Sequence, residues 1–290
     1  MSNVNQVYKR IFELQREYLE LAVGRESLLK ILYEAEVSEQ VYNSNAIENS
    51  TLSLEETDKI LQQIDLDRFI SERELFEAKN LARVVEYTHV KAPQRPMDLE
   101  VIMLMHQMLI SNIRDEIAGR FRNDDEWVKV GSHIAVDPKR VVPMLQAMMV
   151  DYQSSAQEHI TRRIARLHLT FEQIHPFVDG NGRIGRAVNN YLLIREGYVP
   201  INIKFIDRSQ YYDAFEEFNS KGTTKVMEEI VAKALTSSYH KRLAYMQGKK
   251  IVLLKDYAKE GKLSASNLIN KAKRQTIDAF WEKGKWKIGV

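Results

Sequence analysis

Apolar residues recur along most of the chain at the three- and four-residue spacing that places side chains on one face of a helix. The first segment carries one such stripe, made of Val4, Tyr8, Ile11, Leu14, Tyr18 and Leu21. Ser53 and Glu56 have the spacing of a capping box, which predicts a helix over 54–63. The same reasoning predicts further helices over 72–90, 98–108, 141–152, 167–174, 184–194 and 227–239. The fold class expected from this pattern is all-α.

Two stretches interrupt the helical pattern. Residues 91–96 contain two prolines and indicate a linker. Residues 119–138 contain glycine, proline and the short β-favouring run 127–130, which together predict a loop with a small hairpin. Near the end of the chain, residues 261–290 are expected to form two short helices and a terminal strand over 285–290.

The composition is that of a globular protein and excludes several classes of function. Of 290 residues, 44% are hydrophobic and 28% are charged, close to the average of soluble domains. The absence of cysteine rules out disulfides, thiolate metal sites and a cysteine nucleophile, and it fits a reducing compartment. No apolar run reaches about 18 residues and the N-terminus lacks a signal pattern, so we expect a cytoplasmic protein without membrane contact.

Charge is distributed unevenly, although the net charge is only +2. Residues 241–290 hold 13 Lys/Arg against 4 Asp/Glu, so the preceding 240 residues carry a net negative charge. A basic tail on an acidic body is typical either of a solvated, lysine-rich surface or of a nucleic-acid contact. The charge count alone leaves both interpretations open.

Residues suited to phosphate chemistry are concentrated in one segment, HPFVDGNGRIGR over 175–186. Its glycines allow close backbone approach, and the helix that it opens offers free N–H groups to an anion. Arg183 and Arg186 share a helical face, where two guanidinium groups suit a polyphosphate. Asp179 is a hard oxygen ligand for Mg²⁺, and His175 can exchange a proton near neutral pH. The whole segment predicts a nucleotide phosphate site beside a base, rather than a glycine-rich turn with solvated arginines.

The segment matches the Fic family signature, H-P-F-x-[D/E]-G-N-G-R-x-x-R, at every fixed position, and the chain resembles that family over roughly residues 40–220. The resemblance implies an α-helical core that transfers AMP from ATP to a Ser, Thr or Tyr hydroxyl of a target protein, releasing pyrophosphate. Phosphotransferase relatives of the Doc type have Lys where this chain has Gly182, which favours AMP transfer.

The resemblance also implies residue roles. His175 would be the general base, and Asp179 would hold Mg²⁺ on the α- and β-phosphates. Arg183 would bind the β-phosphate and Arg186 the γ-phosphate. The residues expected around ATP are Asp179, Gly180, Asn181, Gly182, Arg183, Ile184, Gly185, Arg186, Tyr211, Tyr212, Asn219, Val130, Gly131, Ser132 and His133. Among these, Tyr211, Tyr212 and Asn219 would surround the adenine, and residues 130–133 belong to a hairpin flap that would hold the target segment.

A second motif, SNAIEN over 44–49, resembles the family's inhibitory helix motif, [S/T]-x-x-x-E-[G/N]. By this resemblance, Ser44 and Glu48 would form the inhibitory site. The carboxylate of Glu48 would reach Arg186 and occupy the place of the γ-phosphate. An N-terminal position of the motif implies inhibition within the same chain.

The predicted organisation has three parts: an N-terminal helical region over 1–96, a Fic-type helical core over 97–235, and a C-terminal module over 236–290. The last part resembles a winged-helix-like module, with helices at 266–271 and 275–281 and a strand at 286–290. Such modules bind DNA in some relatives and mediate protein contacts in others, and relatives often form homodimers. The alternatives are UMP transfer, removal of AMP from a modified target, a DNA-binding regulator with an ATP-sensing core, and a metal phosphohydrolase that the lack of ligand pairs disfavours.

Overall fold

The computed structural model describes residues 3–131 and 133–290, and within them it contains twelve α-helices and five strands. The helices are α1 (Asn3–Ala22), α2 (Glu26–Ile47), α3 (Leu54–Leu61), α4 (Glu72–Lys91), α5 (Leu99–Ile110), α6 (Val141–Ser154), α7 (Ile160–Ile174), α8 (Asn181–Arg195), α9 (Arg208–Lys221), α10 (Lys225–Met246), α11 (Leu254–Glu260) and α12 (Ala265–Lys273). The strands are β1 (Lys129–Val130), β2 (His133–Ile134), β3 (Ile251–Leu253), β4 (Ala279–Glu282) and β5 (Lys285–Gly289). Short 3₁₀ helices lie at Asp115–Ile117, Pro138–Arg140 and Phe205–Asp207. The expected all-α class with a small hairpin is confirmed.

Local signals in the sequence explain where several helices begin. Ser53 accepts a hydrogen bond from the N–H of Glu56, whose carboxylate accepts one from the N–H of Ser53 in return, so the predicted capping box opens α3. Asp98 caps α5 through the N–H of Val101. The linker expected over 91–96 is a short turn between α4 and α5.

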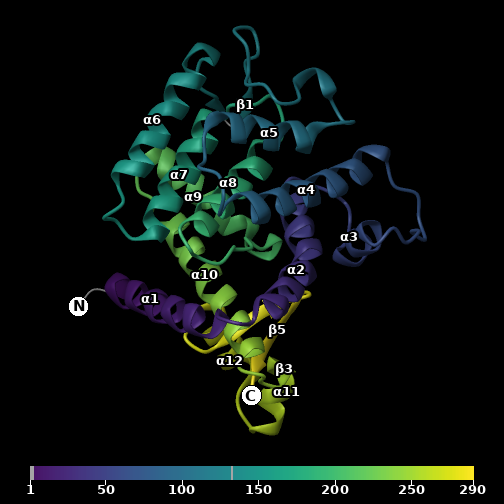
Figure 1. Cartoon of the computed structure of the whole chain (residues 1–290), viewed down its shortest axis with the longest axis vertical. Helices are drawn as coiled ribbons and strands as arrows, with labels where there is room; N and C mark the ends of the chain where they lie inside the picture. The colour runs from purple at the N-terminus through teal and green to yellow at the C-terminus, as the bar shows by residue number, and fades with distance from the viewer. Residues whose placement is uncertain (1–2, 132) are drawn as a thin grey trace.

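The helical core is built around α7, which packs against α6, α8 and α10. Figure 1 shows α10 running from this core toward the C-terminal end of the molecule, with α1 lying across it. Within the predicted apolar stripe of α1, Ile11 and Leu14 are buried in the core, and Tyr18 and Leu21 pack against it. α2 and α4 also pack against α8, and Figure 1 shows one end of α2 close to β5.

Within the C-terminal module, residues 251–289 form a small antiparallel sheet in the order β3-β5-β4, with α11 and α12 beside it. The prediction of a helix over 275–281 is wrong, because residues 279–282 form β4 and pair with β5. Lys283 and Gly284 turn between the two strands with φ angles of 48° and 74°, which suits a two-residue hairpin. The sequence analysis also missed α11, whereas the helix expected over 266–271 corresponds to α12.

α10 continues without a break through residues 235–236, where the core and the C-terminal module were expected to divide. Its second half packs against β4 and β5. In the described part of the chain, no helix combines the length and hydropathy needed to cross a membrane.

Candidate nucleotide site

The loop of residues 175–180 makes a tight connection between α7 and α8. His175 ends α7 with a left-handed φ of 51°, and Gly180 precedes α8 with a φ of 79°. A Cβ at Gly180 would also lie only 3.0 Å from Leu109 and 3.3 Å from Ile110 of α5, so the left-handed backbone favours glycine and little space is left for a side chain. Asn181 holds the loop closed, because its side chain accepts from the N–H of Phe177 and donates to the carbonyl of Phe177, each at 2.8 Å. The Asn181 amide therefore stabilises the conformation of the loop. A contact between Asn181 and a phosphate stays a prediction.

Arg122 fastens this loop to the segment around the flap. Its guanidinium donates to the carbonyl of His175 at 2.8 Å, to that of Ile174 at 3.3 Å and to that of Val136 at 2.8 Å. Its backbone N–H donates to the carbonyl of Pro176 at 2.9 Å. Because Arg122 is buried and satisfies several carbonyls at once, it fixes the position of the base relative to the flap.

His106 supports the same loop from α5. Its ring stacks on Phe177 with centroids 3.7 Å apart, and its Nδ1 accepts from the N–H of Gly119 at 3.1 Å. The proton is therefore on Nε2, which donates to the carbonyl of Asp179 at 3.1 Å. Burial lowers the pKa of His106 to about 4, so the ring is neutral at physiological pH. No local spacing links His106 to these partners, because they lie on other elements.

Asp179 and Arg183 belong to a cluster of alternating charges with two residues of α4. Arg183 pairs with Glu77 at 3.2 Å and with Asp179 at 3.3 Å. Arg73 pairs with Glu77 and with the other oxygen of Asp179, each at 3.1 Å. Burial raises the pKa of Asp179, but Arg183, the N–H of Gly180 and Arg73 outweigh it, so the pKa lies below its usual value. Asp179 is therefore ionised at neutral pH.

Arg186 is buried, and its donors are directed at α2 and α9. Its Nη2 donates to Glu48 Oε1 and to the carbonyl of Ser44, both at 2.8 Å, and its Nε donates to Ser44 Oγ at 3.0 Å. Its Nη1 donates to the hydroxyl of Tyr211 at 3.1 Å. The structure therefore brings together three residues that lie far apart in the sequence: Ser44, Glu48 and Arg186.

The end of α2 is shaped to present Glu48. Glu48 caps the helix, and Asn49 follows in the left-handed region with a φ of 71°, a conformation that asparagine tolerates. Oδ1 of Asn49 accepts from Arg208 at 2.7 Å, which anchors this turn to α9. A side chain at Gly182 would collide with the Glu48 carboxylate, so the absence of one leaves the space that the carboxylate occupies.

A cleft of about 1050 Å³ opens in front of these groups. Its walls come from the end of α2, the flap, α7, the loop 175–180, the start of α8 and α9. Predicted site residues on these walls are Glu48, Val130, Gly131, His175, Gly182, Tyr211, Tyr212 and Asn219. The volume lies near the upper end of the range for small-molecule sites, so a nucleotide has room there.

The aromatic residues expected near the adenine occupy different environments. Tyr212 is half exposed, and its hydroxyl donates to the carbonyl of Ile47 at 3.1 Å. Tyr211 is buried, and its hydroxyl lies 2.7 Å from His168 Nε2 besides accepting from Arg186. Burial lowers the pKa of His168 to about 3, so this packed, hydrogen-bonded ring is neutral. Tyr211 therefore holds the side chain of Arg186 in place. Ile184, which was also expected to lie around ATP, is fully buried in the core.

The base candidate, His175, lies one helical turn from a buried carboxyl group. Its Nδ1 is 3.7 Å from Oε2 of Glu172 on α7, and both side chains are largely buried. Burial raises the pKa of Glu172 to about 8, with a further increase from Glu48 and an opposing effect of Arg186. The sequence analysis did not single out Glu172, although its position three residues before His175 on a helix is a signal for contact.

The flap is a hairpin of two-residue strands in which Lys129 pairs with Ile134 and Val130 with His133. Trp127 and Ile134 expose apolar side chains beside it. Of the residues expected there, Val130 and Gly131 line the cleft, and Ser132 lies outside the described residues.

The carboxylate of Asp179 fits a Mg²⁺ ion. It is ionised and partly exposed, and its present partners are arginines rather than other acids. The described residues contain no group of three or more acidic or histidine side chains that could hold a metal by themselves. Mg²⁺ commonly binds through one carboxylate together with substrate phosphates and water, which matches this single ligand.

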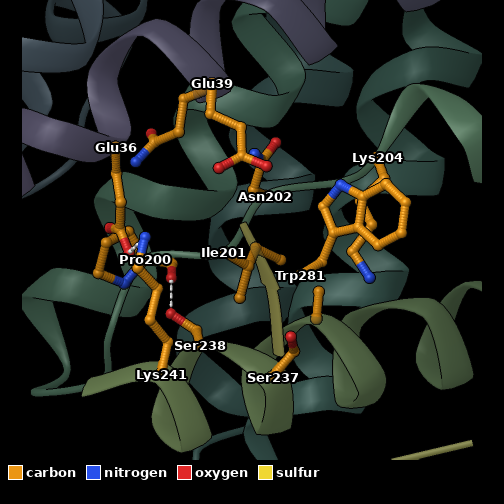
Figure 2. Close-up of a pocket in the computed structure, with 12 residues that line it drawn as sticks. Glu36, Glu39, Pro200, Ile201, Asn202, Lys204, Ser237, Ser238, Lys241 and Trp281 are labelled. Carbon is orange, nitrogen blue, oxygen red and sulfur yellow. Dashed lines mark hydrogen bonds and ion pairs between the residues drawn. The ribbon is translucent and has the colours of Figure 1, made fainter. Parts of the chain in front are cut away.

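A second, much smaller pocket of about 50 Å³ lies where α2 meets α10 and the C-terminal module (Figure 2). Glu36 on α2 pairs with Lys241 at 3.2 Å and with Arg242 at 2.6 Å. Lys241 also pairs with Glu282 of β4 at 2.8 Å, and Glu39 accepts from the N–H of Lys283 at 3.2 Å. This pocket is too small for a nucleotide, and its charges hold α2 against the C-terminal module.

Comparison with known proteins agrees with this geometry. Residues 96–193 match the model of the Fic/DOC family. A protein adenylyltransferase Fic of Drosophila mojavensis is 30% identical over 199 residues, which are 67% of this chain and 39% of that protein. The chain is a member of the Fic family. It spans about two fifths of the length of this curated relative.

Solved structures show the same Fic fold. A Fic domain containing signaling protein of Bacteroides thetaiotaomicron is 22% identical and covers 83% of this chain and 98% of that one, with a TM-score of 0.73. A Fic family protein of Desulfovibrio desulfuricans is 21% identical and covers 97% of this chain and 96% of that one, with a TM-score of 0.64. The second match extends the likeness of fold to the C-terminal module.

Proposed function

We propose that this chain is a protein adenylyltransferase that transfers AMP from ATP to a Ser, Thr or Tyr hydroxyl of a target protein. The observation that carries the proposal is the position of His175 beside the N-terminus of α8, at the wall of a cleft of about 1050 Å³ that the flap also borders. Relatives that carry the name protein adenylyltransferase support the same reaction class.

In this reaction the target hydroxyl oxygen forms a bond to the α-phosphorus of ATP. The bond between that phosphorus and the oxygen that bridges to the β-phosphate breaks, and pyrophosphate leaves with the electron pair. The proton of the hydroxyl moves to His175 Nε2, since His175 is the neutral-pH base of the loop. The edge of the flap would hold the target segment by strand addition, and exposed Trp127 and Ile134 offer it apolar contacts.

The phosphates would lie against the N-terminus of α8. Arg183 would contact the β-phosphate and Arg186 the γ-phosphate, and the free N–H groups of the helix would add neutral donors. Asp179 would hold Mg²⁺, which supplies positive charge to the phosphates when bound. In the present structure Arg73 occupies one oxygen of Asp179, so metal binding would require that this pair opens.

The resting state would be inhibited by Glu48. Its carboxylate takes the Arg186 donor that the γ-phosphate needs, and it lies over Gly182 at the start of α8. Release of this contact would free both the charge and the space. UMP transfer and removal of AMP from a modified target use the same groups and remain alternatives. Homodimer formation and the cytoplasmic location stay predictions from the sequence.

Mass spectrometry of the chain after incubation with ATP and Mg²⁺ tests the reaction class. We expect a mass increase of one AMP through automodification. His175→Ala should reduce the rate by about 10²–10⁴-fold while ATP binding persists, because attack by a neutral hydroxyl needs a positioned base. UTP in place of ATP separates the nucleotide alternatives. Wild-type rates in His175→Ala would show that another group is the base.

A DNA contact through the C-terminal module is a second candidate function. The observation in its favour is that α12 is largely exposed and ends in a basic run, Lys271, Lys273 and Arg274. Binding of the full chain to a DNA duplex should weaken steeply as salt rises, because each phosphate contact releases a counterion. The control is the triple substitution of these three residues by Ala. If wild type and control shift the duplex equally, or neither does at low salt, α12 is not a DNA-binding element.

A further inference from the structure

Glu172 is a buried carboxyl group in the cleft for which the proposed reaction, as described above, has no use. It lies on the last turn of α7, and its side chain lines the cleft together with His175. Oε2 is 3.7 Å from His175 Nδ1, and Oε1 is buried without a hydrogen-bond partner among the described residues. A buried carboxyl group that directs an oxygen at a histidine needs an explanation, since burial of such a group is costly unless it has a function or a partner.

Gly185 gives an independent sign that space is reserved for this carboxyl group. Gly185 lies within α8 and has no left-handed conformation, so its backbone does not require glycine. Glycine in the interior of a helix normally lowers the stability of that helix by about 1 kcal/mol relative to alanine. A Cβ at this position would lie only 2.7 Å from Oε1 of Glu172 and 3.1 Å from the ring of His168. The missing side chain therefore lets the carboxyl group sit between α7 and α8, beside the base.

We propose that Glu172 is a positioning residue for His175: its carboxylate receives the Nδ1 proton, so that Nε2 presents a lone pair to the target hydroxyl. The inference rests on the proposed transfer reaction, in which His175 is the base. A carboxylate at Nδ1 selects the tautomer with a free Nε2 and stabilises the imidazolium that forms when the proton arrives. Only a closing movement of about 1 Å separates the present distance from hydrogen-bond length, and catalytic hydrogen bonds are often longer before substrate binds.

The charge state of Glu172 depends on its surroundings. The ionisable groups that face it are His175, Glu48, Arg186, His168 and Tyr211. Of these, Glu48 raises the pKa of Glu172 and Arg186 lowers it, after the larger effect of burial. Withdrawal of Glu48 therefore favours ionised Glu172, and this is the form that positions the base. Inhibition by Glu48 would then act at two places, at Arg186 directly and at His175 through Glu172.

The test compares Glu172→Gln and Glu172→Asp in a Glu48→Gly background. Glutamine keeps the shape and removes the charge, whereas aspartate keeps the charge on a shorter side chain. Glu229→Gln is the control for loss of one carboxylate, because Glu229 is an exposed residue of α10 away from the cleft. The measurements are the pH profile of automodification, the KM for ATP and the NMR titration of His175, assigned by its loss in His175→Ala.

We expect Glu172→Gln to shift the acid limb of the pH profile down by about one pH unit, because a carboxylate within 4 Å no longer stabilises the imidazolium. The plateau rate should fall while the KM for ATP stays unchanged, and Glu172→Asp should keep most of the acid limb. The NMR titration of His175 should move in the same direction. A profile and a titration that match those of Glu229→Gln would overturn the proposal.

The two proposals can fail separately. If the Glu48→Gly parent transfers no nucleotide, the proposed function fails, yet the titration of His175 still reports whether Glu172 controls it. If Glu172→Gln does not fold, Glu172→Ala is the second variant without a carboxylate. A fall of about one unit in the pKa of His175 in folded Glu172→Ala supports the proposal, and a titration at the parent value overturns it.

Discussion

Helix α2 is held at two places, and the two contacts differ in what surrounds them. At its C-terminal end, Glu48 pairs with Arg186 at the wall of a cleft of about 1050 Å³, and its side chain is 35% exposed. Twelve residues earlier, Glu36 pairs with Lys241 and Arg242 beside a pocket of about 50 Å³, and its side chain is only 12% exposed. Both contacts are carboxylates facing buried cations from other elements.

These surroundings give the two contacts different properties. The Glu48–Arg186 contact can be exchanged for a contact with a ligand, whereas the contacts of Glu36 can only be broken. A ligand phosphate can enter the cleft and take over the donors of Arg186, so the loss of the Glu48 contact leaves no unpaired charge. No ligand can replace Glu36, because the space beside it holds no more than a water molecule or two. Loss of that contact would leave Lys241 and Arg242 as buried cations with one acidic partner fewer. The first contact therefore suits regulation and the second suits attachment of the C-terminal module.

Replacement of Glu48 should produce the largest effect at the exchangeable contact. Glu48→Gly should raise automodification by about 10- to 1000-fold, which corresponds to a resting population of 0.1–10% of the open site. The free energy of unfolding should change little. The measurement is the AMP adduct by mass spectrometry over time, with Glu34→Gly as the control on the exposed face of the same helix.

Arg186→Ala supplies the reverse change. In the Glu48→Gly background it should remove most of the gained activity, because the γ-phosphate loses its buried charged partner. If Glu48→Gly leaves the rate at the wild-type value, Glu48 is not inhibitory. If Arg186→Ala leaves the gained activity intact, Arg186 does not bind the phosphate that Glu48 displaces.

Replacement of Glu36 should act on stability instead. Glu36→Gln should lower the free energy of unfolding by about 3 kcal/mol, since it breaks a largely buried charge pair from one side. Automodification by the folded protein should stay low, because Ser44 and Glu48 still hold Arg186. Chemical denaturation and the transfer assay measure the two effects, with Glu34→Gln as the matched control. Activation equal to that of Glu48→Gly, with unchanged stability, would show that the two contacts are not distinct.

The candidate site was largely predictable because its key groups are contiguous. His175, Asp179, Arg183 and Arg186 lie within twelve residues, so one loop and one helix start fix their arrangement. The partners that complete it come from other elements: Arg122 from the segment before the flap, and Glu77 from α4. Their roles depend on tertiary packing, which no local spacing encodes.

The secondary structure, too, was predictable only where the signal is local. The ranges of α3, α4, α5, α6 and α8 were predicted to within a few residues, whereas α7 and α10 are longer than predicted and no range was predicted for α2 or α9. In the C-terminal module α12 and β5 were predicted, but α11 and β4 were not. Residues 275–281 contain a short apolar run that fits a helix or a strand, and only its pairing with β5 decides between them. The signal that could have identified the strand is Lys283-Gly284, a two-residue turn flanked by aromatic residues. α11 has only seven residues, too few for its periodicity to be distinctive.

The smallest expected effect is the response of the Glu36 region to acid. Burial raises the pKa of Glu282, but Lys241 and Lys287 outweigh it, so the pKa is lower than the usual value of 4.5. Below pH 4.5 the unfolded chain then binds this proton more readily than the folded one, and the stability that Glu282 contributes is lost as the pH falls through its folded pKa. Glu39 has the opposite sign, because burial raises its pKa and the folded protein favours its neutral form.

The two carboxyl groups should therefore oppose each other in acid. Between pH 7 and pH 3, the Tm of Glu282→Gln should fall less than that of wild type, because the acid-sensitive contribution is absent. The Tm of Glu39→Gln should fall more than that of wild type, since a contribution that grows as the pH falls has been removed. Thermal unfolding followed by circular dichroism at several pH values measures both slopes. Parallel slopes in all three proteins would mean that neither carboxyl group controls the acid response, and that the contact of α2 with the C-terminal module is insensitive to its own charges.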